Sequence, residues 1–192
     1  DLLWFYVRMN DLRVTDLMQG PVYGISTEET DQDDRLVSNF HYDDIFGTLV
    51  NRFLVQAVAG VPLTVYGKGG QKRGYLNIRD TLQCVELAAA NPADRGELRV
   101  FNQFTEVFSV NELAEKVQKA GNEVGLDVSI QHISNPRNEP EEHYYNPDNT
   151  ALIDLGLEPT YMSQEVIVQL LKRVAQYEEN IDREKIEPRV TW

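Results

Sequence analysis

The chain has 192 residues and a net charge of −13, and 42% of its residues are hydrophobic, which is enough to bury a core. A uniformly acidic surface repels phosphate backbones, so a nucleic-acid partner is disfavoured, whereas a nucleotide can bind where cations cluster. The one cysteine, Cys84, excludes an intrachain disulfide and a cysteine-based metal site, and no apolar run approaches the length of a membrane span.

The first part of the chain predicts a helix, a strand and an acidic loop. The helix covers 2–10 and the strand 13–18, and glycines flank a tight loop at 20–24. The acidic run 26–44 has two interpretations, a cation site or mobile lid on one side and a solvated loop on the other. The loop is favoured because the carboxylates show no spacing that converges on a metal ion.

The next part combines one amphipathic helix with two short strands. Apolar residues at helical spacing predict a helix over 46–58 that ends at Gly60. Strands are predicted at 63–66 and 74–78, with a glycine-rich turn at 67–71 between them.

The rest of the chain continues this alternation. Asp80 is predicted to cap a helix over 81–90, and Ser109 with Glu112 forms a capping box for a further helix. The remaining predicted elements are strands at 98–102 and 128–133, an irregular loop at 135–146, a short helix at 149–155, and a helix that Ser163 caps and that runs to 180. Strands that alternate with helices indicate an α/β class with at least partly parallel pairing.

The segment Gly67–Arg73 is the strongest candidate for a ligand site. Its glycines allow a ligand to approach the backbone closely, and Lys68, Lys72 and Arg73 place three cations within six residues of an acidic chain. Arginine can hold a phosphate through two parallel hydrogen bonds. A P-loop is excluded because a strand, and not a helix, follows. A hairpin turn with solvated lysines is the alternative that the residues leave open.

The segment Asn135–Glu139 is the second candidate. Pro136 stiffens the backbone before Arg137, and Glu139 follows two positions later. This pattern suits a diphosphate contact from Arg137 and a ribose contact from Glu139, and a surface ion pair explains it as well. The three histidines show no metal spacing, so no metal site is predicted. No glycine-rich dinucleotide fingerprint occurs at a strand–helix junction.

Four segments together resemble a known family. They are Arg13–Gly24, Leu63–Asp80, Arg99–Glu106 and Asn135–Asn146. Their order and spacing are similar to the second half of the extended short-chain dehydrogenase/reductases that act on nucleotide sugars. The stretches Phe-Asn-Gln-Phe-Thr-Glu and Glu-Glu-His-Tyr-Tyr-Asn are the more specific part, and they resemble the branch that uses UDP-glucose and sulfite. The resemblance covers the chain from about residue 12 to its end.

This resemblance implies a fold. We expect an α/β chain with a truncated NAD-binding Rossmann fold, of which the last strands and helices are present, and a smaller C-terminal α/β domain that binds the nucleotide sugar. The implied boundaries are 1–24 for the end of the Rossmann domain, 25–80 for the first part of the substrate domain, 81–102 for the returning Rossmann helix and strand, and 103–192 for the second part of the substrate domain.

The resemblance also implies a reaction. NAD oxidises carbon 4 of the UDP-glucose ring, water is lost across carbons 5 and 6, sulfite adds to carbon 6, and the hydride returns to carbon 4. The cofactor is therefore NAD, and the substrates are UDP-glucose and sulfite. The intact enzyme is expected to be a homodimer, located in the cytoplasm of a bacterium or in the plastid stroma of a plant.

Site residues follow from the resemblance position by position. Gln19 and Val22 are expected at the nicotinamide end of NAD, and Gln19 also at the sugar. Gln71, Arg73 and Arg137 are expected at the diphosphate. The remaining substrate contacts are Thr48 and Asn51 on a helix, Thr64 and Tyr66 beside the uracil, Gln103 and Thr105 near the sugar-nucleotide pocket, and Glu139 at the ribose.

One departure concerns the catalytic residues. The family's Tyr-x-x-x-Lys pair and catalytic Thr are expected upstream of residue 1, and Tyr6 is followed four positions later by Asn10. No catalytic residue is therefore expected in this chain, and the isolated chain is expected to be inactive. Two alternatives remain open. The parent enzyme is another NAD-dependent nucleotide-sugar epimerase or dehydratase, or the chain is a non-catalytic module that binds a UDP-sugar.

Overall fold

The computed structural model describes residues 2–37, 39–43, 45–135 and 145–186. Its strands are β1 (Val14–Gln19), β2 (Val22–Tyr23), β3 (Leu63–Tyr66), β4 (Lys72–Asn77), β5 (Leu98–Gln103), β6 (Glu106–Ser109) and β7 (Ile130–Ile133). Its α-helices are α1 (Leu2–Asn10), α2 (Glu28–Gln32), α3 (Leu49–Val58), α4 (Ile78–Ala90), α5 (Val110–Glu123), α6 (Thr150–Asp154) and α7 (Gln164–Ala175). Three short 3-10 turns follow at η1 (Asp34–Leu36), η2 (Glu178–Asn180) and η3 (Arg183–Lys185).

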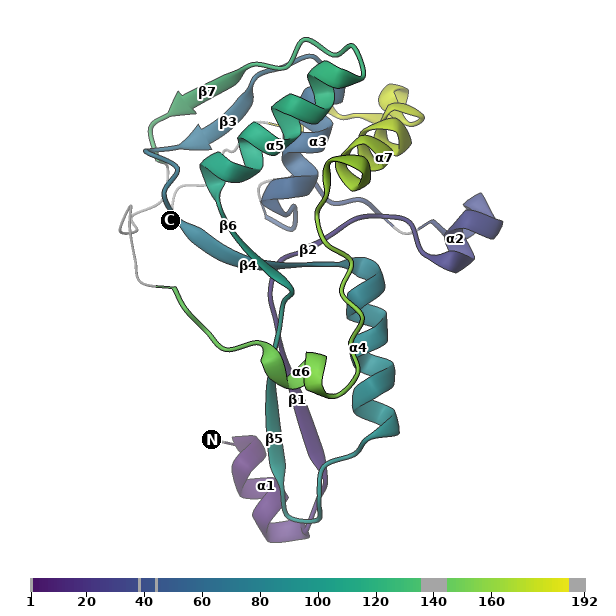
Figure 1. The fold of residues 1–192 in the computed structure, drawn as a ribbon, viewed down its shortest axis with the longest axis vertical. Coiled ribbons are helices and arrows are strands. Elements are labelled where there is room, and N and C mark those ends of the chain that lie inside the picture. Colours follow the sequence, from purple (N-terminus) through teal and green to yellow (C-terminus); the bar gives the residue numbers. More distant parts are fainter. Residues whose placement is uncertain (1, 38, 44, 136–144, 187–192) are drawn as a thin grey trace.

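The strands form small sheets in which parallel pairing dominates. β1 pairs with β5, β2 with β4, and β3 with β7, all in parallel, whereas β4 and β6 are antiparallel. The predicted α/β class with partly parallel pairing is confirmed. In Figure 1, β1 and β5 lie with α1, α4 and α6 in the lower part, and the other strands lie with α3, α5 and α7 above them. The implied domain boundaries stay a prediction.

Two hydrophobic cores hold these two parts. The larger core lies between α3, α5 and α7 and includes Phe53, Leu113 and Leu171, all nearly or fully buried. In the smaller core, Cys84 of α4 and Phe101 of β5 pack with Leu152 of α6 and with Leu157, which follows α6. Burial of a large apolar side chain stabilises the fold by about 1.5–3 kcal/mol, so the helices are held by these contacts more than by their own propensity.

The starts of three helices follow local capping signals, and in one of them the capping residue differs from the predicted one. Ser109 and Glu112 form the predicted capping box, and the Ser163 hydroxyl accepts from the amide of α7 at Val166. The prediction for Asp80 is wrong, because Asn77 caps α4 and the helix begins at Ile78. Asp80 is instead fully buried, and its carboxylate accepts a hydrogen bond from the Thr160 amide at 3.0 Å.

The acidic run is not a plain solvated loop. Thr27 begins α2 with a capping box, so the run contains a short helix and a 3-10 turn. Two of its carboxylates pair with other elements: Asp31 with Arg79 at 2.8 Å and Asp34 with Arg173 at 2.6 Å. These ion pairs connect the segment to α4 and α7, a tertiary contact that the local pattern did not indicate.

The glycine-rich turn does not close a hairpin. β3 and β4 flank it in sequence, but β3 pairs with β7 and β4 pairs with β2 and β6. The alternative of a hairpin turn is therefore wrong, and the turn crosses from one sheet to another. Two short strands were also missed by the sequence prediction, β2 within the predicted loop at 20–24 and β6 before α5.

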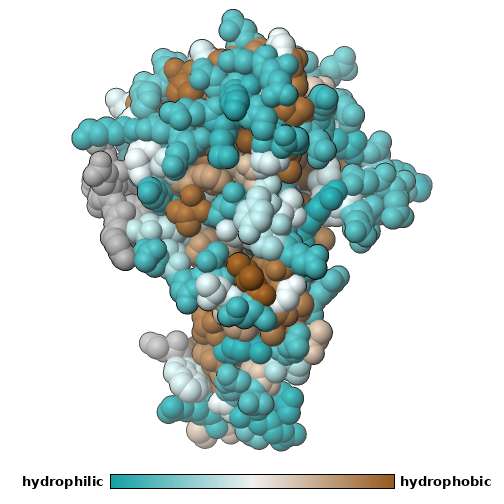
Figure 2. Space-filling view, viewed as in Figure 1, coloured by the Kyte–Doolittle hydropathy of each residue, from teal (hydrophilic) through white to brown (hydrophobic). Residues whose placement is uncertain are grey.

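Apolar side chains remain exposed in the part that contains β1 and β5. On α1 only Val7 is buried, while Leu2, Trp4 and Phe5 are between 44% and 70% exposed. Val100 of β5 and Val85 of α4 are also about half exposed. Figure 2 shows hydrophobic residues at the surface of this narrower part. Within the described residues, no helix is long and apolar enough to cross a membrane.

Candidate functional site

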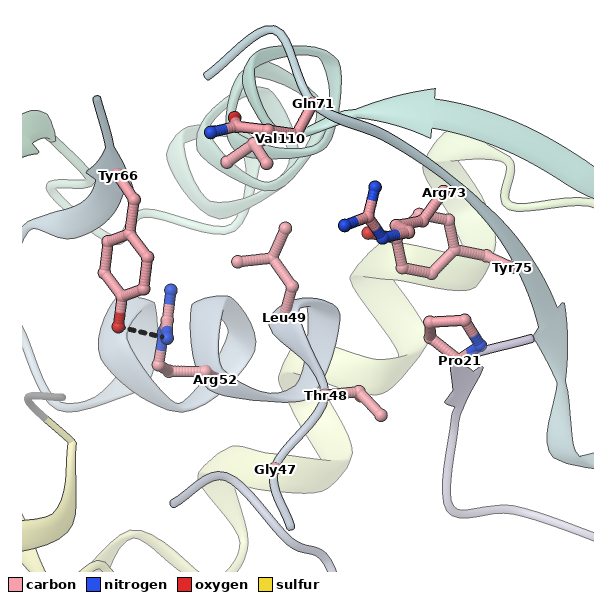
Figure 3. Close-up of a pocket in the computed structure, with 10 residues that line it drawn as sticks. All are labelled: Pro21, Gly47, Thr48, Leu49, Arg52, Tyr66, Gln71, Arg73, Tyr75 and Val110. Atoms are coloured by element: carbon pink, nitrogen blue, oxygen red, sulfur yellow. Dashed lines mark hydrogen bonds between the residues drawn. The ribbon is translucent and has the colours of Figure 1, made fainter. Parts of the chain in front are cut away.

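A cavity of about 290 Å³ opens between the start of α3 and the start of β4. Its wall comes from five places in the sequence, which Figure 3 shows converging from the start of α3, the end of β3, the start of β4, the first residue of α5 and the segment between β1 and β2. The lining residues are Pro21, Gly47, Thr48, Leu49, Arg52, Tyr66, Gln71, Arg73, Tyr75 and Val110. We call this space the α3–β4 cavity.

The α3–β4 cavity is cationic, although the chain as a whole is acidic. Its lining includes two guanidinium groups, Arg52 and Arg73, and no carboxylate among the described residues. A concave surface that carries one sign of charge attracts ligands of the opposite sign. The lining charges therefore favour an anion, and guanidinium groups match phosphate oxygens in geometry as well as in charge.

Arg52 and Tyr66 form one side of the cavity as a fixed pair. The Arg52 side chain is buried, and its Nη1 donates to the Tyr66 hydroxyl at 2.8 Å while Nη2 donates to the Thr64 carbonyl at 3.3 Å. Its guanidinium also lies 4.7 Å from the centre of the Tyr66 ring. Two hydrogen bonds and a cation–π contact hold both side chains in one orientation, so a ligand meets a pre-organised wall.

The opposite side is made by alternate residues of β4 and the turn before it. Gln71, Arg73 and Tyr75 all line the cavity, because side chains two positions apart point to the same face of an extended chain. Burial raises the pKa of the Tyr75 phenol to about 12, although the nearby Arg73 and Arg52 act in the opposite direction. Tyr75 is therefore a neutral hydroxyl at neutral pH and can donate a hydrogen bond.

Two polar groups in the cavity wall, the Gln71 amide and the Thr48 hydroxyl, are buried without a partner among the described residues. Gln71 is only 5% exposed, and neither its amide nitrogen nor its amide oxygen has a hydrogen-bond partner in the described part of the chain. The Thr48 hydroxyl is also unpartnered there, although Thr48 occupies the N-cap of α3, where such a hydroxyl usually bonds the backbone. Buried polar groups are nearly always satisfied, so these two indicate a site that a polar ligand completes.

Four of the residues expected at the site line this cavity, and six others lie elsewhere in the structure. Thr48, Tyr66, Gln71 and Arg73 are the four. Gln19 is exposed at the end of β1, and Val22 lies on β2. Asn51 donates to the His41 carbonyl, and Thr64 bonds the Gln56 amide through its own amide and hydroxyl. The Gln103 amide donates to the Thr81 carbonyl, and the Thr105 hydroxyl donates to the Tyr75 carbonyl. Arg137 and Glu139 lie outside the described residues.

The sequence prediction missed Arg52, Tyr75 and Val110. A signal for Arg52 existed, because it lies four residues before Gln56 in a helix whose other residues, apart from Asn51, are apolar. Residues at this spacing share one helix face, and a polar pair on a buried face indicates an internal polar site. Tyr75 had a signal too, since it continues the alternation that begins with Gln71 and Arg73. In the part of the chain that the structure covers, no group of His, Cys, Asp and Glu could hold a metal ion.

No protein-family model matches the chain. The chloroplastic UDP-sulfoquinovose synthase of Spinacia oleracea is 56% identical over 181 residues, which is 94% of this chain and 38% of that protein. The UDP-sulfoquinovose synthase of Sulfolobus acidocaldarius is 45% identical over 194 aligned positions, which cover 100% of this chain and 49% of that protein. The chain resembles one part of UDP-sulfoquinovose synthase.

The resemblance drawn from the four segments is thus confirmed, and UDP-sulfoquinovose synthase is the relative that it indicated. The chain spans less than half the length of either of these relatives. Among solved structures, the UDP-glucose 4-epimerase of Thermus thermophilus, determined in complex with NAD, matches with a TM-score of 0.64 and 22% identity. That match covers 89% of this chain and 49% of the epimerase. It confirms an α/β fold of the nucleotide-sugar epimerase type, of which this chain holds about half.

Proposed function

We propose that this chain is the sugar-nucleotide-binding part of a UDP-sulfoquinovose synthase, an NAD-dependent enzyme that forms UDP-sulfoquinovose from UDP-glucose and sulfite. One observation carries the proposal: among the described residues, the α3–β4 cavity combines two guanidinium groups with two unpartnered polar side chains and no carboxylate. A nucleotide diphosphate supplies both the negative charge and the acceptors that such a wall requires. The 56% identity to the spinach synthase supports the choice of substrate.

The diphosphate is assigned to the side of the cavity that Gln71 and Arg73 form. Both project from the same face of the turn and β4, so a phosphate between them meets an amide and a guanidinium together. The neutral Tyr75 hydroxyl adds a donor on that side. Arg52 is held in place by its hydrogen bonds to the Tyr66 hydroxyl and the Thr64 carbonyl. Its role is therefore to supply positive charge within the cavity wall.

The uracil is assigned to the side that Tyr66 forms. The Arg52 guanidinium lies over the Tyr66 ring. A base beside this ring can pack against it in the offset or edge-to-face arrangement that aromatic groups prefer. Thr64 supports this wall from behind, since its amide and carbonyl already bond Gln56 and Arg52. The Thr48 hydroxyl is assigned to the sugar or ribose.

The remaining substrate contacts are carried as proposals from the family resemblance. Asn51, Gln103 and Thr105 are assigned to the substrate side, and Arg137 and Glu139 to the diphosphate and ribose. A homodimer, and a cytoplasmic or plastid location, also stay predictions for the intact enzyme.

The described residues fit one edge of an NAD site. Gln19 is exposed at the carboxyl end of β1, the edge at which open α/β sheets bind dinucleotides, and Val22 follows it closely. These two residues would contact the nicotinamide end. When bound, NAD supplies the acceptance and return of a hydride at carbon 4 of the sugar. The role of this chain is to bind UDP-glucose and to orient its ring toward that edge.

The redox chemistry requires residues that this sequence does not contain. None of its nine tyrosines is followed four positions later by a lysine. A tyrosine needs a nearby cation to lower its pKa before it can act as an acid or base near neutral pH. We therefore propose that the isolated chain binds UDP-glucose without converting it.

Two other functions are separated from this one by specific results. The fold likeness to the Thermus epimerase favours a nucleotide-sugar epimerase or dehydratase as the second candidate. Sulfite-dependent product formation by the full-length protein distinguishes the synthase from it. A non-catalytic UDP-sugar-binding module is the third candidate, and it predicts binding with no turnover even when all residues of the longer protein are present.

Isothermal titration calorimetry of UDP and UDP-glucose tests the proposed cavity directly. The wild-type chain should bind both, and Arg73→Gln should raise Kd by about 10- to 100-fold, because a hydrogen bond to a charged group contributes about 1.5–3 kcal/mol. Arg95→Gln is the matched control, since Arg95 is exposed and pairs with Asp11 at 3.3 Å. Absent binding by the wild type, or equal affinity for both variants, contradicts the proposal.

A further inference from the structure

The turn that carries Gln71 toward the α3–β4 cavity is held by one residue that no part of the site description uses. Asn111 lies in the first turn of α5, one residue after Val110. Its backbone amide donates to the Gly69 carbonyl at 3.1 Å, and its side-chain Nδ2 donates to the Lys68 carbonyl at 2.8 Å. Asn111 therefore donates hydrogen bonds to two consecutive carbonyls of the turn.

The contact leaves no room for a side chain at position 69. Gly69 has a φ of 72°, a conformation that favours glycine, and a Cβ atom at this position would collide with the Asn111 side-chain oxygen. The glycine therefore gives both the backbone angle and the space that Asn111 needs. The turn and the start of α5 fit each other as one unit.

Two neighbouring residues hydrogen-bond further carbonyls of the same turn. The Val110 amide donates to the Gln71 carbonyl at 3.2 Å, and His132 on β7 bonds the Gly67 carbonyl at 2.8 Å. Four carbonyls from Gly67 to Gln71 are thus fixed, two of them by Asn111. Fixing the carbonyl sides of these peptides sets the direction in which the Gln71 side chain leaves the backbone, and Arg73 follows two residues later on β4.

We propose that Asn111 is a positioning residue for the diphosphate side of the cavity. It acts through the turn, by holding Gln71 and Arg73 where a diphosphate meets them, and it does not line the cavity itself. This inference rests on the proposed function, since it assigns to Asn111 a part in the recognition of UDP. It predicts that losing the side-chain bond weakens contacts to the diphosphate and spares contacts to the nucleoside.

Two substitutions separate positioning from stability. Asn111→Asp keeps the size of the side chain but removes the donor to Lys68, and an acidic residue in the first turn favours the helix dipole, so the helix itself is not weakened. Asn111→Ala removes the donor without adding charge, which controls for repulsion between an aspartate and the diphosphate. Asn122→Ala is the matched control, because the Asn122 side chain also fixes a loop, by accepting from the Val128 amide at 3.1 Å.

The test compares UDP with uridine by calorimetry and adds hydrogen exchange of residues 67–73. For both Asn111 variants, Kd for UDP should rise about tenfold, Kd for uridine should change less than about twofold, and exchange in 67–73 should become faster, since a lost hydrogen bond of ordinary strength corresponds to changes of this order. Asn122→Ala should leave all three unchanged. Equal losses for UDP and uridine, no loss for either, or unchanged exchange in 67–73 overturns the inference.

The same experiment distinguishes failure of the inference from failure of the proposed function. If the wild-type chain binds neither UDP nor uridine, the proposed function is wrong for this chain. The exchange data then decide the positioning claim alone, because the hold of Asn111 on the turn does not depend on a ligand. Faster exchange in the Asn111 variants supports that hold, and unchanged exchange overturns it.

Discussion

Replacing Gln71 with methionine should stabilise the ligand-free protein, although the change removes a polar residue from the proposed site. The Gln71 amide is buried, and both of its polar atoms lack a partner among the described residues. A buried polar group without a hydrogen bond costs about 1–3 kcal/mol. Methionine has a similar length and no group to satisfy, so Gln71→Met should recover most of this cost.

Gln56 provides a control with the opposite sign. It is fully buried like Gln71, but its amide is bonded: Nε2 donates to the Thr64 hydroxyl at 2.9 Å, and Oε1 accepts from the Thr64 amide at 3.1 Å. Gln56→Met leaves the Thr64 amide buried without its partner. The same substitution should therefore destabilise the protein at position 56 by about 1–3 kcal/mol.

Thermal and urea denaturation of the two variants measure this difference. In a domain of this size a change of about 1 kcal/mol shifts Tm by about 2–4 °C. Gln71→Met should raise Tm and weaken UDP binding while the fold is retained, and Gln56→Met should lower Tm. A loss of stability at position 71 as large as that at position 56 would refute the reasoning, because it would mean that the Gln71 amide is already satisfied.

Two further predictions concern the fold that supports the site. Ser109→Ala removes one half of the capping box of α5 and should lower the free energy of unfolding by about 1 kcal/mol in urea denaturation; no change would mean that the cap is replaced by solvent. Burial raises the pKa of the Asp80 carboxyl above its ordinary value of 3.8. The folded state therefore keeps a proton that the unfolded chain releases, and the contribution of Asp80 to the free energy of unfolding falls as the pH rises through the raised pKa. Asparagine at position 80 does not titrate. The free energy of unfolding of Asp80→Asn minus that of the wild type should therefore increase between about pH 4 and pH 7, and an equal difference at both values would contradict the raised pKa of Asp80.

Local signals predicted the elements that depend on local interactions. The capping box at the start of α5 follows from the four residues Ser109 to Glu112, and most of α3 follows from apolar residues at helical spacing, although the predicted helix began at 46 and the observed one begins at Leu49. Asp80 shows where such signals fail. Asn77 and Asp80 can each cap a helix; Asn77 does so, and the Asp80 carboxylate accepts from the Thr160 amide, 80 residues further along the chain.

The site was predicted where ligand chemistry is visible in the sequence and missed where it depends on packing. The glycines and cations of 67–73 indicated a ligand site at this turn, and the family resemblance added Gln71 to Arg73, but a glycine-rich turn also suits a hairpin. Only the pairing of β3 with β7 and of β4 with β6 excludes the hairpin. Arg52 was missed because a single arginine in a helix usually faces solvent, and its burial follows from Tyr66 and Thr64 on a different element.

A crystal structure of this chain grown with UDP-glucose tests the central claim most directly. The proposal predicts the diphosphate in the α3–β4 cavity, with an oxygen within hydrogen-bond distance of the Arg73 guanidinium and another near the Gln71 amide, and the uracil beside Tyr66. A nucleotide bound at another surface, or an empty cavity at a ligand concentration that saturates binding in solution, would contradict it.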